Sequence, residues 1–251
     1  MKLIKLDAID STNDFLKKLS KDNDLENFTV VTAETQTNGR GQVGAEWYSE
    51  SGKNLIVSVL AKNVPVQADS IFDSNVAVSV SISNILKANN VPNVTIKWPN
   101  DIMSDDKKIA GILIENTFKS DQEIYSIIGF GLNVNQTNFE NLPKASSLLN
   151  ICNKEFDRNK LLIQIIKSLE TNIYAMIYPE ICNNFWKTYN GQLYKKGKLT
   201  VFEDYNKQKF MGIIRTVHRN GKLVVEIEND VLKEYDLKEI SIYNSSPEFF
   251  I

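Results

Sequence analysis

Lys97-Trp98-Pro99-Asn100-Asp101 is the stretch that decides the fold of this chain. The residues around its start predict a short strand over 95–98, and Pro99 stiffens the turn that the strand enters. Two apolar runs follow, over 108–115 and 124–129, and they predict a pair of neighbouring strands. A polar turn thus stands between buried strands, where its side chains can be aimed at a ligand.

Outside this stretch, the N-terminal part alternates strand-like and helix-like patterns, which predicts an α+β protein. The turn Asp10-Ser11-Thr12-Asn13 can cap the first helix. Pro179 is expected to interrupt the helical pattern after residue 177. The further predicted strands are 3–9, 28–33, 54–60 and 132–134, and the predicted helices are 14–20, 71–89, 158–177 and a short one at 185–189.

After about residue 191 the pattern changes to short strands with tight turns. The turn at Asn220-Gly221 is a strong hairpin signal. This region predicts a small β-barrel of roughly fifty residues, close to the lower limit for independent folding. We therefore expect two domains, over 1–190 and 191–251. The predicted strands of the second domain are 199–202, 210–217, 223–227 and 235–242.

Composition excludes several classes of function. The net charge of −2 argues against bulk electrostatic binding of nucleic acid. Cys152 and Cys182 form no CxxC pair, which fits a reducing, cytoplasmic setting and argues against a disulfide framework. His218 is the only histidine, so histidine-based metal or acid–base chemistry is set aside. The sequence carries no signal-peptide pattern and no apolar run that could span a bilayer, so no membrane partner is expected.

The segment Gly39-Arg40-Gly41-Gln42-Val43-Gly44 is a candidate anion-binding loop. Its glycines free the backbone to turn N–H groups toward an anion, and Arg40 offers a planar fork for carboxylate or phosphate. The segment fits neither a Rossmann fingerprint nor a P-loop. On the local pattern alone, a surface turn with a solvated arginine is the commoner reading.

The turn at 97–101 combines a cation, an amide and a carboxylate. Lys97, at a strand end, can meet a phosphate. Asp101 can hold Mg²⁺, which prefers oxygen ligands and usually brings phosphates with it. An Asn-Asp turn with a packed tryptophan is the commoner use of such residues. No other metal ligand set is predicted.

Two further segments could contribute to a site. Lys108 stands at the mouth of an apolar strand beside Gly111, whereas strand alternation sends Lys107 to the opposite face. The residues alone leave the choice between the two lysines open. In Gly129-Phe130-Gly131-Leu132-Asn133, the glycines permit close approach of a flat ring, and the Asn133 amide could read an adenine edge. The alternative is a kinked strand.

These motifs, in this order, resemble biotin protein ligases, also called biotin–[acetyl-CoA-carboxylase] ligases. The resemblance runs along nearly the whole chain and is most specific at the two lysine motifs. It implies a class II synthetase-like catalytic domain with a mixed β-sheet, the biotin/lipoate ligase fold, followed by a small SH3-like barrel. The matching segments are 10–13, 36–47, 97–101, 107–115, 129–133 and the C-terminal β-rich region.

The resemblance implies an enzyme that binds biotin and MgATP and makes biotinyl-5′-AMP with loss of pyrophosphate. It then transfers biotin to one lysine of the biotin carboxyl carrier protein or domain of a carboxylase. Lys108 matches the family's essential lysine, and Asp101 would assist near the metal or the acceptor lysine. Family members are monomers or homodimers, and a homodimer is our expectation here.

Roles for the remaining site residues also follow from the resemblance. Ser11, Thr12, Asn13 and Gln36 would line the biotin pocket. Arg40, Gly41 and Gln42 would lie in the loop that orders over biotin and the adenylate. Trp98 and Asn100 would support the ATP side, and Asn133 the adenine. Gly39, Trp47, Lys97 and Gly111 complete the expected ligand-binding set.

Two departures from the family pattern stand out. The family's loop often carries more arginines, but this chain has Gln42 and Ala45 at those positions. The second arginine is associated with retaining the adenylate, so we hypothesise that this enzyme holds it less tightly or that another cation substitutes. The chain also begins at the ligase motifs, so we expect a monofunctional ligase without an N-terminal DNA-binding domain.

Two other functions stay open at this point. Lipoate–protein ligases and octanoyltransferases share the fold and act on similar carrier domains. A non-catalytic biotin-binding module would have the fold without the lysine and the aspartate, and Lys108 and Asp101 are both present. The loop around Arg40, the turn at 97–101 and the C-terminal barrel favour biotin.

Overall fold

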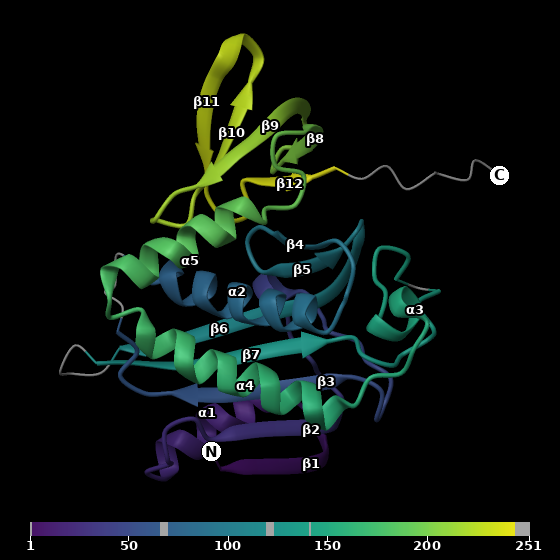
Figure 1. The fold of residues 1–251 in the computed structure, drawn as a ribbon, viewed down its shortest axis with the longest axis vertical. Helices are drawn as coiled ribbons and strands as arrows, with labels where there is room; N and C mark the ends of the chain where they lie inside the picture. Colours follow the sequence, from purple (N-terminus) through teal and green to yellow (C-terminus); the bar gives the residue numbers. More distant parts are fainter. Residues whose placement is uncertain (1, 66–69, 119–122, 141, 244–251) are drawn as a thin grey trace.

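The computed structural model describes residues 2–65, 70–118, 123–140 and 142–243. It contains two β-sheets and a set of helices packed on the larger sheet (Figure 1). The α+β class predicted from sequence is confirmed, with a mixed first sheet and an antiparallel second sheet near the C-terminus. No described helix is long and apolar enough to cross a lipid bilayer.

The first sheet has seven strands in the order β1-β2-β3-β7-β6-β5-β4. β1 and β2 pair in parallel, joined by α1, and the other neighbours pair antiparallel. This mixed sheet brings the turn after β4 next to the start of β6. Its strands are β1 (Leu3–Ile9), β2 (Val30–Gln36), β3 (Leu55–Ala61), β4 (Val94–Lys97), β5 (Asp101–Ser104), β6 (Lys107–Phe118) and β7 (Ile124–Leu132).

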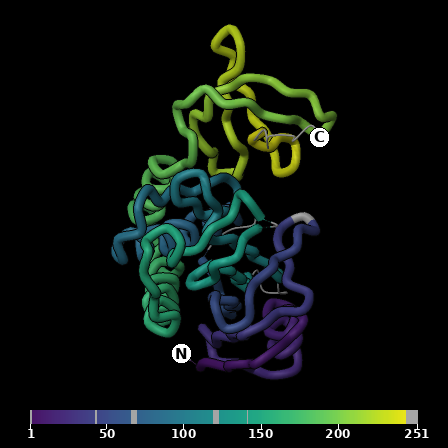
Figure 2. Tube along the Cα trace, turned by 90° about the vertical axis from the view of Figure 1, so that its right-hand side faces the viewer, coloured from purple at the N-terminus to yellow at the C-terminus, as the bar shows by residue number. Residues whose placement is uncertain are grey.

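Helices cover both faces of the first sheet. α2, α4 and α5 lie on one face, and α1 lies on the other, where it contacts β2, β3 and β7 (Figures 1 and 2). A short 3₁₀ turn, η1 (Gln42–Gly44), follows β2. The helices are α1 (Thr12–Asp22), α2 (Phe72–Ala88), α3 (Leu148–Cys152), α4 (Arg158–Ala175) and α5 (Pro179–Gly191).

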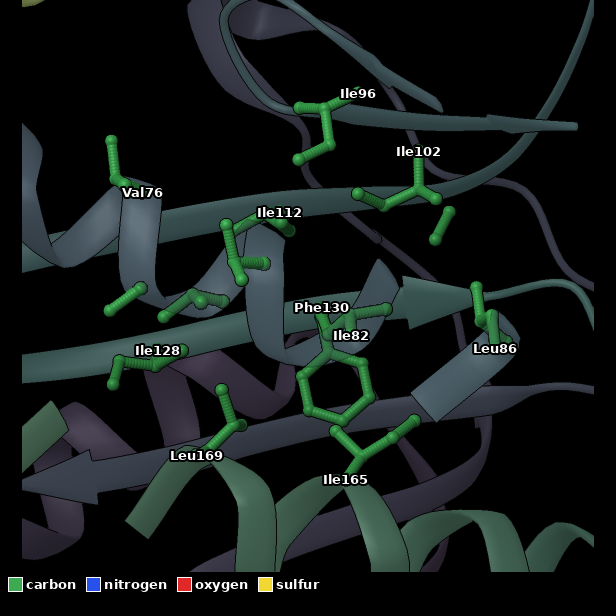
Figure 3. Packing of buried hydrophobic residues seen from close by; sticks show 14 of the residues in the cluster. Val76, Ile82, Leu86, Ile96, Ile102, Ile112, Ile128, Phe130, Ile165 and Leu169 are labelled. Carbon is green, nitrogen blue, oxygen red and sulfur yellow. The ribbon is translucent and has the colours of Figure 1, made fainter. Parts of the chain in front are cut away.

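The main core lies between the sheet and the helices α2 and α4. Figure 3 shows Ile112, Ile128 and Phe130 of the sheet meeting Ile82 of α2 and Ile165 of α4. These side chains are almost completely buried, which removes apolar surface from water and fixes the sheet against the helices. A smaller cluster around Leu16 and Leu60 attaches α1 to the opposite face. The sheet is thereby rigid on both sides of the positions that carry the site.

The second sheet has five antiparallel strands in the order β11-β10-β9-β8-β12. Among the described residues this order is open rather than closed into a ring. A 3₁₀ turn, η3 (Glu228–Asp230), joins β10 to β11. The strands are β8 (Leu199–Asp204), β9 (Lys209–Val217), β10 (Leu223–Ile227), β11 (Val231–Tyr235) and β12 (Ile240–Ile242). Residues 244–251 of the predicted second domain lie outside the described residues.

Several predicted element bounds differ from the structure. The single strand expected over 235–242 is two strands, because a turn in which the Glu239 N–H bonds to the Asp236 carbonyl separates them. The sequence predicted no element over 102–104, but residues 101–104 form strand β5, since β4 and β6 pair with them on both sides. Pro179 interrupts the helical pattern as expected, but the second helix begins at Pro179 rather than at residue 185, because a proline costs no hydrogen bond at the first helical position.

Candidate active site

A cavity of about 230 Å³ lies between the start of α1, the loop after β2 and the facing stretches of β6 and β7. Below it is called the main cavity. It unites segments that are far apart in the sequence. The residues expected from sequence that line it are Ser11, Thr12, Asn13, Gln36, Arg40, Gly41, Gln42, Trp47, Asn100, Asp101, Lys108 and Gly111.

One end of the main cavity is a buried polar network at the start of α1. Ser11 caps the helix by accepting from the Asp14 N–H, which places the next two residues in the first turn. The Thr12 hydroxyl and N–H donate to Gln36 Oε1 at 3.0 and 2.8 Å. Ser58 Oγ lies 2.8 Å from Thr12 Oγ1 and 2.6 Å from Asn13 Oδ1. These groups are fixed before any ligand arrives.

Two glycines of β7 leave room for this network and for the ring of Trp47. A Cβ atom at Gly129 would stand 2.3 Å from Asn13 Oδ1, and one at Gly131 would stand 2.3 Å from Trp47 Cε2. Both distances are too short for real contacts, so glycine is required where the sheet meets the helix start and the loop. The flat glycine face explains why the cavity lies on this part of the sheet.

Trp47 covers the cavity from the loop side. Its indole Nε1 is buried and has no hydrogen-bond acceptor among the described residues. A buried donor without a partner is costly in a folded protein, and at a cavity it marks a place where a ligand can supply the acceptor. The Lys108 ammonium lies 5.8 Å from the centroid of the same ring.

At the other end, Lys108 and Asp101 form an ion pair with Nζ 2.6 Å from Oδ1. Asp101 of β5 lies opposite Gly111 of β6. Gly111 comes three residues after Lys108, so in a regular strand Lys108 and Gly111 would face opposite sides of the sheet. The register shifts here because Ile109 is an extra residue in β6. This bulge brings the Lys108 side chain alongside Gly111, where a Cβ would meet its Cε and Nζ at 3.3 and 3.4 Å.

The neighbouring Lys107 points elsewhere and donates to the carbonyl of Pro143. The structure therefore separates the two lysines that sequence could not distinguish, and it places Lys108 at the cavity. Asn100 is held at the rim by two bonds to Ile112: its amide donates to the carbonyl at 2.7 Å, and its own carbonyl accepts from the N–H at 3.0 Å.

Arg40, in the glycine loop, is held by carboxylates. Its guanidinium bonds to Asp14 and lies 3.7 Å from Glu115. Glu115 also accepts from Asn13 at 2.9 Å and from Lys17 at 3.1 Å. Burial opposes ionisation of Glu115, but these hydrogen bonds and the charges of Lys17 and Arg40 outweigh it and lower its pKa. The loop is thus tied to α1 and β6 through one ionised carboxylate.

A second cavity of about 340 Å³ lies between the turn at 97–101 and the second sheet. Lys97 and Trp98 line this second cavity rather than the main one, whereas Gln42 and Asn100 border both. Burial lowers the pKa of the Lys97 ammonium, with nearby lysines adding to the effect and Asp101 opposing it. Desolvated ammonium groups favour an anionic partner.

Two predicted residues lie outside both cavities. Asn133 is buried directly after the end of β7, where its amide donates to the Ser146 carbonyl at 3.0 Å. Gly39 lies in the loop beside Trp47, with which it exchanges a backbone hydrogen bond. The part of the chain that the structure describes holds no group of three or more His, Cys, Asp or Glu that could bind a metal. Asp101 is the carboxylate available beside Lys108.

Sequence reasoning missed Ser58 and Glu115 as members of the site. Ser58 is completely buried in β3, and its only sequence signal is a hydroxyl inside the otherwise apolar run Leu55–Ala61. Glu115 ends the segment 107–115, and the sequence predicts no role for it. The sequence signal for Glu115 is a carboxylate inside a strand, where charged residues are seldom buried without a partner.

Comparisons with known proteins show the family to which this chain is similar. A model of the Biotin/lipoate A/B protein ligase family matches residues 6–133. The biotin–[acetyl-CoA-carboxylase] ligase of Mycobacterium tuberculosis is 31% identical over 86% of this chain and 80% of its own. The bifunctional ligase/repressor BirA of Escherichia coli is 27% identical over 94% of this chain and 73% of its own. A biotin protein ligase from Aquifex aeolicus, solved with biotin and ATP, superposes with a TM-score of 0.79 at 26% identity, covering 97% of this chain and 99% of that one.

Proposed function

The chain belongs to the biotin/lipoate A/B protein ligase family, and we propose that it is a biotin ligase that joins biotin to a carrier protein. It is an ATP-dependent enzyme that first activates the biotin carboxyl group as biotinyl-5′-AMP. It then transfers the biotinyl group to a lysine of a biotin carboxyl carrier domain. The Lys108–Asp101 pair beside a buried polar pocket is the observation that carries the assignment of these steps to the main cavity.

The geometry supports a placement of biotin along the main cavity. The ureido ring of biotin has both donors and acceptors, which the network of Thr12, Asn13 and Gln36 can match. The valeryl chain would run beside the Trp47 ring toward the charged end of the cavity. Its carboxylate would then reach Lys108, where an ammonium offsets its charge.

The first step joins two anions, so charge must be offset. A carboxylate oxygen of biotin attacks the α-phosphorus of ATP, the bond to the bridging oxygen breaks, and pyrophosphate leaves. Lys108 would stabilise the charge that builds up on the α-phosphate oxygens. Mg²⁺, held by ATP and by Asp101, would neutralise the phosphate oxygens. Lys97, with its lowered pKa, lies on the side where the leaving phosphates would pass.

In the second step the acceptor lysine attacks the biotinyl carbonyl as a neutral amine, and AMP leaves. Asp101, whose side chain is 16% exposed beside Lys108, would accept the proton that the amine loses. We further propose that the partner is one carrier domain of a carboxylase, that the enzyme forms a homodimer and that the reaction runs in the cytoplasm. The two unpaired cysteines support the last proposal.

Lipoate is the alternative substrate within the same family. A lipoyl head group is a disulfide ring without strong donors or acceptors, so it would form no hydrogen bonds with the polar groups around Thr12 and Gln36 at this end of the main cavity. The polar end of the main cavity therefore favours biotin.

The test is carrier-protein modification. The purified protein is incubated with ATP, Mg²⁺, a biotin carboxyl carrier domain and either biotin or lipoate, and the intact mass of the carrier domain is measured. The proposal predicts one biotinyl group on the carrier, dependent on ATP and lost when the acceptor lysine is replaced by arginine. A lipoyl adduct, or an unmodified carrier with both acids, would contradict it.

A further inference from the structure

The hairpin turn His218–Lys222, between β9 and β10, is one of the contacts of the second sheet with the catalytic half; β9 also bonds to Asn190 of α5 through Thr216 and Val217. Arg219 in this turn lies over α2 and α5: its Nη1 is 3.3 Å from Asp73 Oδ2, and its other nitrogen donates to Asn183. Its guanidinium stands 5.6 Å from the ring of Trp186. Asp73 is nearly buried, with 8% of its side chain exposed, and it also accepts from the Trp186 indole.

Asp73 and its neighbours also hold the turn that carries Asn100 and Asp101. Asn75, two residues after Asp73 at the start of α2, donates to the Pro99 carbonyl at 3.2 Å. Tyr189, one helical turn after Trp186 in α5, lies with its hydroxyl 3.4 Å from the same carbonyl. The two helices that Arg219 joins, α2 and α5, are therefore the helices that contact the backbone of the turn.

The hairpin also contacts this turn directly. The Trp98 indole donates to the Gly221 carbonyl at 2.8 Å. A Cβ at Gly221 would stand 2.8 Å from the Phe72 ring, so the hairpin lies against the start of α2 without space between them. The turn at 98–101 is thus held from one side by the second sheet and from the other by the strand partner Gly111.

We infer that Arg219 is a positioning residue for the adenylation step. It lines neither cavity and touches no residue that would contact substrate. Through Asp73 and the adjacent Trp98–Gly221 bond, it fixes the second sheet against the turn whose Asp101 holds Lys108. The inference rests on the proposed function, because it concerns the rate of biotinyl-5′-AMP formation.

The alternative is that Arg219 only adds stability to the joint between the sheets. That role would lower the unfolding temperature and leave the rate of the folded enzyme unchanged. A positioning role moves the rate of the chemical step with little change in the KM for biotin, because the biotin end of the main cavity lies on α1 and is not attached to the hairpin.

The experiment compares Arg219→Ala with Arg215→Ala. Arg215 is on the same sheet and makes an exposed bidentate pair with Glu226, without touching the catalytic half. Pyrophosphate release with biotin and ATP gives kcat and KM, and hydrogen exchange of the ligand-free protein reports on the peptide over 98–104. We expect Arg219→Ala to lower kcat at least about tenfold, to change the KM for biotin less than about twofold and to speed exchange in that peptide. Arg219→Lys, which restores charge opposite Asp73, should recover part of the rate, and Arg215→Ala should match the wild type.

A folded Arg219→Ala protein with wild-type kcat, or with slow turnover but unchanged exchange over 98–104, overturns the inference. If Arg219→Ala does not fold, Arg219→Gln decides, because it keeps a side-chain N–H donor and removes the charge opposite Asp73. Reduced kcat with unchanged KM for biotin supports the inference, and wild-type kcat refutes it. Failure of the wild type to release pyrophosphate would instead refute the proposed function. Hydrogen exchange over 98–104 in wild type and Arg219→Ala would still test whether Arg219 holds this turn.

Discussion

Lys108 and Arg40, the two cations that border the main cavity, are each held by carboxylates. Asp101 holds the first, and Asp14 with Glu115 holds the second. Anionic substrates therefore compete with carboxylates of the protein for both cations. The carboxylates keep the two cations oriented toward the cavity in the absence of substrate. When substrate binds, each cation must leave its carboxylate.

The pH dependence of Glu115 tests this arrangement. Its pKa is lowered in the folded protein, so its contribution to stability is complete above the ordinary glutamate pKa and disappears as pH falls through the lowered value. We expect Glu115→Gln to lose about 1 kcal/mol of unfolding free energy at neutral pH and to equal the wild type in strong acid.

Urea unfolding at a series of pH values measures the difference. Glu203→Gln is the matched control, because the Glu203 side chain is 21% exposed, close to the 23% of Glu115, whereas its ion-pair partner Lys207 is 82% exposed. The control should show little change at any pH. An equal loss for both variants, or a Glu115 effect that grows toward acid, would contradict the arrangement.

Gln42 is a second residue whose replacement tests the site. It borders both cavities, so an arginine there could pair with the phosphate of the bound adenylate. We expect Gln42→Arg to slow the release of biotinyl-5′-AMP about tenfold, the effect of one charge-assisted hydrogen bond. Stopped-flow release and labelling of bystander proteins measure it.

The control for Gln42 is Gln208→Arg, which adds the same charge on the second sheet, between β8 and β9. It should leave release unchanged. If Gln42→Arg also leaves release and bystander labelling unchanged, then the hypothesis of weak retention through this position fails.

Single residues also mark how far the sequence could predict the site. Motif residues gave most of the main cavity, because chemistry-bearing side chains in short motifs are visible without a structure. Ser58 was not visible, since its role depends on pairing of β3 with β7 opposite the start of α1. Asn133 was expected at the adenine, but the structure ties its amide to Ser146, a contact that only the fold reveals. Its role stays a prediction.

At the scale of elements, β6 and β7 shape the cavity by two local irregularities. The bulge at Ile109 turns Lys108 toward Asp101, and the glycines of β7 leave a flat surface under Trp47. Neither feature follows from hydrophobic periodicity, which describes regular strands only. The site thus depends on departures from the pattern that identified the strands.

Gly131→Ala tests the glycine face. The added Cβ would meet the Trp47 ring at 2.3 Å, so the ring must move from its place over the cavity. We expect biotin binding, measured by isothermal titration calorimetry, to weaken at least about tenfold. Gly191→Ala, with nothing within 4 Å of the added atom, should bind biotin like the wild type. Equal affinity for all three proteins would show that the ring is not fixed by this contact.

Element prediction succeeded where apolar patterns are long and failed at the edges. The strand over 3–9 and the helix near 71–89 agree with β1 and α2 to within a residue. β5 was missed because four residues of a hairpin carry too little pattern, and its identity comes from pairing on both sides. Helix α3 was missed for the same reason, because it is only five residues long and begins directly after its Ser147 cap.

At the scale of the whole molecule, the fold brings separate regions of the chain to one cavity and places the second sheet against the turn at 98–101. The start of α1 supplies the polar end, the loop after β2 the cover, and the hairpin of β5 and β6 the charged end. The division into domains at residue 190 stays a prediction, because the contacts through His218–Lys222 join the two sheets closely. The molecule acts as one unit around the Lys108–Asp101 pair.

The most direct test of this account is adenylate formation without a carrier protein. Wild type, Lys108→Ala and the matched control Lys107→Ala are each incubated with biotin, ATP and Mg²⁺, and biotinyl-5′-AMP and pyrophosphate are measured. We predict both products from the wild type and from Lys107→Ala, because Lys107 donates to the Pro143 carbonyl away from the cavity. In Lys108→Ala we expect the rate of adenylate formation to fall at least about 100-fold. Equal rates for the two variants, or no adenylate from the wild type, would contradict the account.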